Sequence, residues 1–133
     1  MPVAIPQNFL DLLAREKKAF AYLATVKKDG FPQVTPVWFD WDGQHIVINT
    51  ARGRVKDKVM HRNPQVAVLI PDPANPYRFL QIQGRVAVET EEGARDHIDD
   101  LAEKYTGARR YPNYKGETRV TYKISPERVQ VNG

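Results

Sequence analysis

Short apolar runs separated by turn signals constrain the fold of this chain more than any other feature of its sequence. Asp29-Gly30 and Asp42-Gly43 each lie between runs rich in β-branched and aromatic residues, which is the pattern of tight hairpin turns. We expect strands over residues 19–26, 31–41, 44–50, 65–72, 77–90, 119–124 and 128–131. Because strands at such short spacing are joined most simply by hairpins, the sequence favours a small antiparallel barrel over a parallel sheet.

Prolines, one glycine and two helical patterns add detail to this picture. Pro32 and Pro36 have no backbone N–H to donate, so residues 31–41 are expected to form an edge strand or to bulge near Pro36. Gly84 lies in the middle of the 77–90 run and predicts a bulge or a sharp bend. Peripheral amphipathic helices are expected over residues 5–18 and 91–105, with apolar faces formed by Phe9, Leu10, Leu12 and Leu13 and by Ala94, Ile98, Leu101 and Ala102.

The composition is that of one globular domain. The 133 residues are 41% hydrophobic and 27% charged, with a net charge of +4, and we expect a single domain over residues 1–133. There is no cysteine, which excludes disulfides and thiolate chemistry. The first residues lack a signal-peptide pattern, and no apolar run approaches the length of a membrane span. A cytoplasmic protein that does not enter a membrane is therefore expected.

A basic stretch over residues 49–64 is the strongest candidate for a binding site. It carries Arg52, Arg54, Lys56, Lys58, His61 and Arg62. Gly53 stands where a strand must turn into a helix, and Val55, Val59 and Met60 are spaced to hold one face of that helix against a core. The start of such a helix offers free backbone N–H groups, so with Arg54 and Lys56 beside it we expect a phosphate or another anion to bind. The alternative is a solvated basic helix without a ligand.

The usual signatures of self-contained catalysis are missing. His45, His61 and His97 are far apart in the sequence, so no metal site is expected. There is no Gly-x-Ser-x-Gly elbow and no glycine-rich nucleotide loop. The sequence identifies no catalytic residue, and difficult chemistry would have to come from a cofactor. Nucleic acid is not an expected partner, because aromatic and basic residues do not interleave as they do on a stacking platform.

Three segments, taken in order, resemble a known family. They are ATVKKDGFPQVTPVWF, INTARGRVKDKVMHRNPQVAV and FLQIQGRVAV, and the resemblance runs from Ile5 to Val131. Together they are similar to the pyridoxamine-phosphate-oxidase-like flavin and deazaflavin oxidoreductases. This resemblance implies a mainly β fold, the FMN-binding split β-barrel of antiparallel Greek-key type with peripheral helices. It also implies a homodimer with cofactor sites at the subunit interface.

The resemblance also implies which residues hold the cofactor. Arg54 and Lys56 match the positions that bind the cofactor phosphate, and the strand around Trp38 matches the segment along the flavin or deazaflavin ring. Packing in the core or in a dimer interface is the alternative role for Trp38. The complete set of candidate cofactor-binding residues is Thr35, Pro36, Val37, Trp38, Asn49, Thr50, Arg54, Val55, Lys56 and Met60.

Departures from the family pattern indicate a branch. The oxidase that makes pyridoxal phosphate carries Arg-Gln-Val-Arg-x-x-Gly, whereas Phe79 stands at the glutamine position here, and the extra C-terminal part of that enzyme is missing. The resemblance is therefore greater to the deazaflavin branch, which uses coenzyme F420. It implies hydride transfer from reduced F420 to a small conjugated or planar acceptor. The polyanionic tail of F420 would meet surplus cations, namely Arg52, Lys58, Arg62, Arg109 and Arg110.

Two alternatives remain open from the sequence. The first is an FMN-binding oxidoreductase or flavin carrier of the same fold. The second is a non-enzymatic protein that binds a cofactor or another anion.

Overall fold

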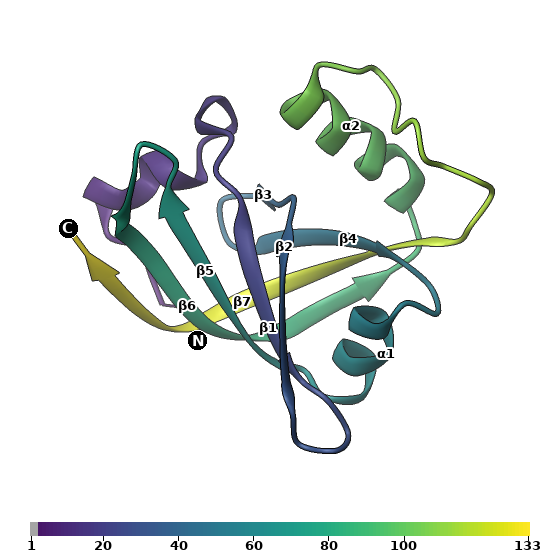
Figure 1. Cartoon of the computed structure of the whole chain (residues 1–133), viewed down its shortest axis with the longest axis horizontal. Coiled ribbons are helices and arrows are strands. Elements are labelled where there is room, and N and C mark those ends of the chain that lie inside the picture. The colour runs from purple at the N-terminus through teal and green to yellow at the C-terminus, as the bar shows by residue number, and fades with distance from the viewer. Residues whose placement is uncertain (1–2) are drawn as a thin grey trace.

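One curled antiparallel sheet makes up most of the molecule. The computed structural model describes residues 3–133, in which seven strands follow the order β2-β1-β5-β6-β7-β4-β3. Figure 1 shows this sheet bent into a half-barrel, with α1 and α2 at its periphery. The strands are β1 Ala21–Val26, β2 Pro32–Val37, β3 Asp40–Trp41, β4 Ile46–Ala51, β5 Gln65–Asp72, β6 Asn75–Thr90 and β7 Arg119–Asn132. The mainly β split-barrel fold expected from the sequence is confirmed.

The helices differ from those that the sequence indicated mainly at the N-terminus. They are the α-helices α1 Val55–Arg62 and α2 Ala94–Thr106 and the 3₁₀ helices η1 Gln7–Leu13 and η2 Arg15–Lys17. The expectation of one α-helix over residues 5–18 is wrong, because the backbone is extended at Ala14. A 3₁₀ helix has three residues per turn, so Phe9 and Leu12 point to the same side and are buried, while Leu10 is exposed. Within residues 3–133, neither α-helix combines the length and the apolar character that a membrane crossing requires.

The prolines of the first hairpin have the effect that the sequence predicted. β2 carries Pro32 and Pro36 and lies at one edge of the sheet, paired with β1. The expected single strand over residues 31–41 is instead two strands, because the chain leaves β2 after Val37 and enters β3, which pairs with β4 at the opposite edge. Trp38 and Phe39 join the two edges, and we call this dipeptide the seam crossing.

Gly84 marks an irregularity in the pairing of β6 with β7, as predicted. The register shifts between Gln83 and Gly84, and a Cβ at Gly84 would lie 2.6 Å from the carbonyl oxygen of Ser125. Pro126 is the residue opposite Gly84. Because a proline is tolerated at such a bulge, β7 continues through it, and the expectation of two separate C-terminal strands is wrong.

The sheet buries side chains on both of its faces. The interior of the half-barrel is filled by large apolar residues, including Phe39, Ile48, Met60, Leu80 and Tyr122. On the outside, α2 packs against β4 and β7. Its buried residues are Ala94, Ile98, Leu101, Ala102 and Lys104, and the first four are those that the helical pattern predicted.

Candidate functional site

A cavity of about 410 Å³ lies where the seam crossing, β4, α1 and α2 meet. We call it the central cavity. Its lining consists of Phe20, Pro36, Val37, Trp38, Asn49, Arg54, Lys56, Ile98, Leu101, Tyr111, Asn113 and Arg119. Six of the ten candidate cofactor-binding residues are in this lining. Segments around residues 36–38, 49 and 54–56, separate in the sequence, are thus brought together.

Cations dominate one part of this lining. Gly53 has a φ of 92°, which lets β4 turn sharply into α1 and places Arg54 and Lys56 at the cavity. Burial lowers the pKa of Lys56, and the neighbouring charges of Arg54 and Arg119 lower it further. Among residues 3–133, no carboxylate lies within ion-pair distance of Arg54 or Lys56. The mutual repulsion of these cations makes the cavity suited to an anionic ligand.

Arg119 is a functional candidate that the sequence reasoning missed. Its side chain is only 3% exposed, and its Nη1 donates to a carboxylate oxygen of Glu117 at 2.9 Å. Its Nε donates to Oδ1 of Asn49 at 2.9 Å, because β4 and β7 pair here. The available signal was weak: Arg119, Thr121 and Lys123 alternate with apolar residues in the first part of the strand, over residues 119–124.

Aromatic rings form another part of the lining. Trp38 stacks on Tyr105 with ring centroids 5.3 Å apart and an angle of 8° between the planes, and Phe20 stacks on the same tyrosine at 5.2 Å. The Tyr105 hydroxyl donates to the carbonyl oxygen of Ala19 at 2.6 Å, and burial raises its pKa to about 12. The position of Trp38 is therefore fixed, and a flat ring beside a cavity suits a planar ligand.

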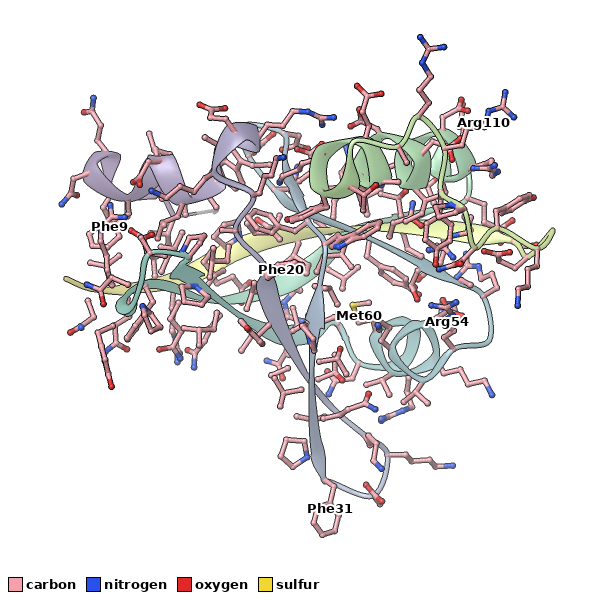
Figure 2. The ribbon with its side chains drawn as sticks, turned by 45° about the horizontal axis from the view of Figure 1, so that its top comes forward. Phe9, Phe20, Phe31, Arg54, Met60 and Arg110 are labelled. Carbon is pink, nitrogen blue, oxygen red and sulfur yellow. The ribbon has the colours of Figure 1, made fainter. Side chains whose placement is uncertain are left out.

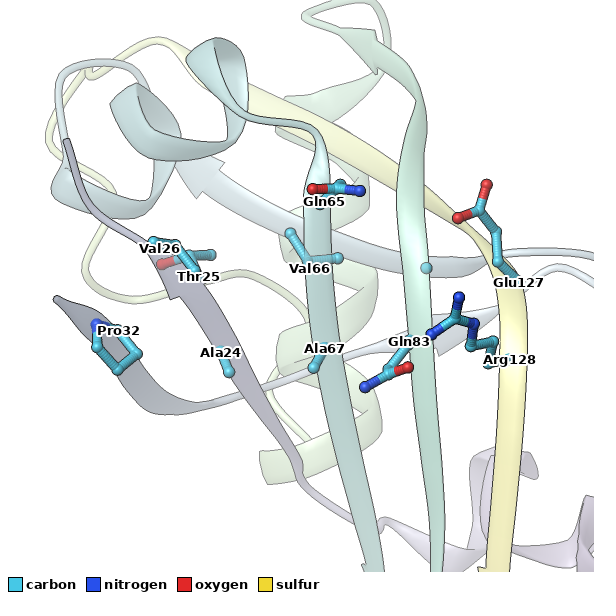
Figure 3. Close-up of a pocket in the computed structure, with 11 residues that line it drawn as sticks. Ala24, Thr25, Val26, Pro32, Gln65, Val66, Ala67, Gln83, Glu127 and Arg128 are labelled. Atoms are coloured by element: carbon cyan, nitrogen blue, oxygen red, sulfur yellow. The ribbon is translucent and has the colours of Figure 1, made fainter. Parts of the chain in front are cut away.

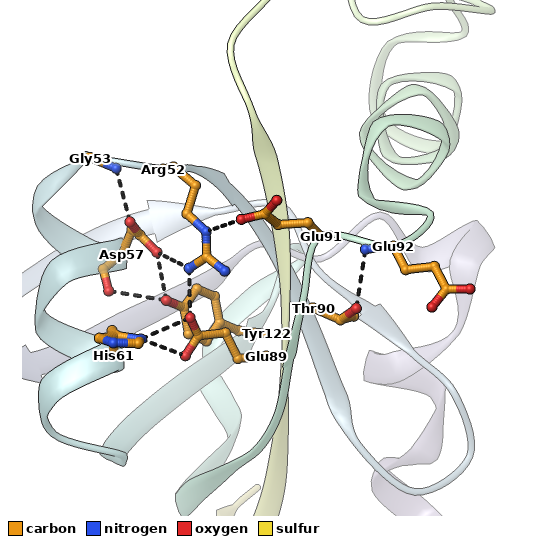
Figure 4. Close-up of polar contacts among 9 residues, drawn as sticks. All are labelled: Arg52, Gly53, Asp57, His61, Glu89, Thr90, Glu91, Glu92 and Tyr122. Carbon is orange, nitrogen blue, oxygen red and sulfur yellow. Dashed lines mark hydrogen bonds and ion pairs between the residues drawn. The ribbon is translucent and has the colours of Figure 1, made fainter.

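The turn that presents Arg54 is held by an ionic network (Figure 4). Arg52 donates to three carboxylates: Asp57 at 3.0 Å, Glu89 at 2.6 Å and Glu91 at 2.8 Å. Asp57 also accepts from the backbone N–H of Gly53 at 2.9 Å and from the hydroxyl of Tyr122 at 2.6 Å. Burial opposes ionisation of Asp57, but these hydrogen bonds outweigh it and lower its pKa. Arg52, predicted as a surplus cation for an anionic tail, is thus engaged within the protein.

The other predicted residues lie apart from the central cavity. Thr50 and Met60 are each only 1% exposed, so neither side chain offers a surface to a ligand. Thr35 and Val55 are not part of the lining either. Arg109 and Arg110 are absent from it as well, and Figure 2 shows Arg110 beyond α2, well separated from Arg54. No group of three histidine or acidic side chains placed to hold a metal occurs in residues 3–133.

Two further hollows help to define the site. A second cavity, of about 520 Å³, is lined by Ala51, Arg52, Gly53, Arg54, Tyr111, Asn113, Lys115 and Glu117. It shares Arg54, Tyr111 and Asn113 with the central cavity, so a long ligand bound at Arg54 has room on both sides.

A groove of about 320 Å³ runs over the outer face of the sheet between Ala24 and Arg128 (Figure 3). Arg128 is the only cation that residues 3–133 contribute to its lining, which makes the groove a weaker anion site.

Comparison with known proteins identifies the family. The family model for pyridoxamine 5'-phosphate oxidase matches residues 6–133. The chain therefore belongs to the pyridoxamine 5'-phosphate-oxidase-like family, as its sequence motifs predicted. No curated protein matches it significantly.

Solved structures add detail to this assignment. An F420 reductase is similar at 32% sequence identity and a TM-score of 0.84, over 95% of this chain and 98% of the other. An FAD-binding protein from Mesorhizobium loti is similar at 22% identity and a TM-score of 0.66, over 94% and 92%. HupZ from Group A Streptococcus is similar at 19% identity and 0.69, over 96% and 94%. The last two show the shared fold alone. The family and the F420 reductase together support an oxidoreductase of the flavin or deazaflavin type.

Proposed function

We propose that this protein is an F420-dependent oxidoreductase that transfers a hydride from the reduced deazaflavin to a small conjugated or planar acceptor. The observation that carries the proposal is the convergence of Arg54, Lys56 and Arg119 on one cavity that also has an aromatic lining. The similarity to an F420 reductase supports the choice of cofactor.

The residues of the central cavity fit such a cofactor. Arg54 and Lys56 have no carboxylate partner among the described residues and would bind its phosphate. Trp38 and Pro36 would lie along the ring, while Ile98 and Leu101 would keep water from it. When bound, the deazaflavin supplies the hydride chemistry, and the protein fixes the position of the ring and of the acceptor.

The second cavity supports F420 over a shorter cofactor. F420 carries an acidic tail beyond its phosphate, and this cavity continues from Arg54 to Lys115. Lys115 therefore takes the place of Arg109 and Arg110 as the surplus cation best placed for the tail. FMN, which ends at its phosphate, would leave the second cavity empty.

We also propose that the protein is a homodimer with the central cavity near its interface. The outer face of β1, β2 and β5 carries a continuous apolar surface, because Tyr22 is paired with both Pro36 and Leu69, and Ala24 with both Val34 and Ala67. We call these six residues the outer apolar patch. Val34 is 65% exposed, and such a patch is typical of a protein interface. Pro36 also lines the central cavity, so a partner on this patch would lie beside the cofactor.

Calorimetric titration of the purified apoprotein with F420 and with FMN tests the proposed cofactor. We expect F420 to bind more tightly, and we expect Arg54→Ala/Lys56→Ala to weaken its binding by about a hundredfold or more, since each lost charge-assisted hydrogen bond is worth about 1.5–3 kcal/mol. Lys58→Ala/Arg62→Ala is the matched control. It removes two exposed cations from the same helix without touching the cavity lining.

Each other outcome points to one of the alternatives. Tighter binding of FMN would assign the protein to the flavin branch of the family. Binding of F420 without reduction of any planar acceptor in a screen would favour a cofactor carrier. If neither compound bound, the proposal would be wrong, and the cations would have to serve another anion.

A further inference from the structure

A line of three polar side chains runs from α2 to the central cavity. His97 of α2 lies with its Nδ1 3.1 Å from Nδ2 of Asn49, and Asn49 in turn accepts from Nε of Arg119 at 2.9 Å. Nδ2 of Asn49 also donates to the carbonyl oxygen of Ala94 at 2.9 Å. Asn49 and Arg119 line the cavity, whereas His97 does not.

Arg119 and the backbone carbonyl of Ala94 fix the direction of every hydrogen bond that Asn49 makes in this line. The guanidinium of Arg119 can only donate, so the atom of Asn49 that faces it must be the carbonyl oxygen. The backbone oxygen of Ala94 can only accept, so the atom that faces it must be the amide nitrogen. The second amide hydrogen of Asn49 is then directed at Nδ1 of His97, which must accept it. His97 is therefore neutral, with its proton on Nε2.

The surroundings of His97 agree with a neutral ring. Burial lowers its pKa, and its Nε2 is buried without a hydrogen-bond partner among residues 3–133. The nearby charges act in both directions: Asp40 and Asp100 favour protonation, whereas Lys123 of β7 and Lys104 of α2 oppose it, and burial has the largest effect. The geometry and the burial thus select the same protonation state.

From this line of contacts we infer that His97 is a positioning residue for anion binding. Neutral His97 holds the amide of Asn49 in the orientation that keeps Arg119 directed at the cavity. Protonation would turn Nδ1 into a donor facing another donor, and Asn49 would have to rotate away from Arg119. Among the described residues, Arg119 uses only Nε and Nη1 in hydrogen bonds, so Nη2 is left for the ligand. The inference rests on the proposed function of the central cavity.

This inference predicts a specific pH dependence. Because protonation of His97 breaks the line, affinity for an anionic cofactor is present above the lowered pKa of His97 and is lost as the pH falls through it. The variant His97→Asn keeps an acceptor at the position of Nδ1 and cannot titrate, whereas His97→Leu removes the acceptor. We expect the ratio of wild-type to His97→Asn affinity for F420 to fall by about tenfold as His97 becomes protonated, the equivalent of one charge-assisted hydrogen bond.

Two measurements test the inference. The first is calorimetric titration with F420 between pH 5 and pH 8, in which the ratio of wild-type to His97→Asn affinity at each pH removes the titration of F420 itself. We expect His97→Leu to be weaker at every pH. The control is His45→Asn, which removes a histidine bound to Asp42 outside the cavity lining, and we expect it to keep the wild-type profile.

The second measurement needs neither a ligand nor a variant. Nitrogen NMR of labelled histidine reports which ring nitrogen of His97 carries the proton, and we expect Nε2 at pH 7. A proton on Nδ1, or a charged ring, would overturn the inference whatever binds in the cavity. A wild type that binds F420 with the same pH profile as His97→Asn would overturn the inference alone. A wild type with the expected tautomer that binds neither F420 nor FMN would overturn the proposed function, and the inference with it.

Discussion

At the scale of single residues, Asp57 anchors the turn that presents Arg54. It accepts from Gly53, Arg52 and Tyr122, and its side chain is only 8% exposed. Asp57 lies in the first turn of α1, where a negative charge is favourable, and it accepts from the N–H of Gly53, the residue before the N-cap Arg54. The turn that carries Arg54 is therefore held in place before any ligand arrives.

We expect Asp57→Asn to destabilise the protein by about 2 kcal/mol or more, because it removes the charged acceptor and leaves buried donors without a good partner. Urea unfolding of the free protein measures this change. Glu91→Gln is the control, since Glu91 is 55% exposed where it meets Arg52, and we expect a change within about 0.5 kcal/mol. Equal effects of the two substitutions would contradict the anchoring role of Asp57.

The sequence predicted Arg54 and Lys56 but not Arg119, for a physical reason. A glycine between a strand and a helix is a local pattern, and cations beside it can be assigned to the site without knowledge of the fold. Arg119 meets Asn49 across 70 residues of sequence, through strand pairing that no local pattern reveals. Arg52 and Glu89 are 37 residues apart in the sequence, and their contact was hidden for the same reason.

At the scale of elements, the close approach of β6 and β7 at Gly84 limits what the sheet tolerates. A Cβ at this position would lie 2.6 Å from the backbone oxygen of Ser125 and 2.9 Å from Cγ2 of Ile124. Because one neighbour is backbone and the other is a buried side chain, neither can easily move to make room for a methyl group at this position. The two longest strands are therefore coupled at this point.

We expect Gly84→Ala to destabilise the protein by about 3 kcal/mol, at the upper end of the cost of overpacking. Thermal and urea unfolding measure the change. The control is Gln83→Ala at the neighbouring exposed position, for which we expect a change within about 0.5 kcal/mol. A Gly84→Ala protein as stable as the wild type would show that β6 and β7 can separate here.

Elements were predicted well where side-chain periodicity decides the structure, and poorly where tertiary contacts do. The α2 pattern gave the correct buried face, and β5 has the predicted bounds. The apolar residues near Phe9 fit α-helical and 3₁₀ spacing about equally well, so the sequence alone did not distinguish them. The break after Val37 depends on β3 pairing with β4, which the run 31–41 does not encode locally.

At the scale of the whole molecule, the outer apolar patch decides whether the proposed dimer forms. We expect the wild type to have the mass of a dimer in light scattering, and Val34→Glu/Leu69→Glu to have the mass of a monomer, because two charges would be buried in the interface. We also expect the monomeric variant to bind F420 more weakly, since Pro36 of the patch lines the central cavity.

The matched control for the dimer is Tyr77→Glu. Tyr77 is 80% exposed and is not part of the outer apolar patch, so this variant should keep the mass and the affinity of the wild type. A wild-type protein with the mass of a monomer at micromolar concentration would contradict the proposed dimer. A single chain would then have to form the whole cofactor site.

The seam crossing also gives the protein an optical property. The chain has two tryptophans: Trp38 in the seam crossing lines the central cavity, and Trp41 packs against the core of the half-barrel. A chromophore held in the cavity would accept excitation energy from Trp38 at close range. Trp38 is therefore also a fluorescent reporter of any ligand in the central cavity.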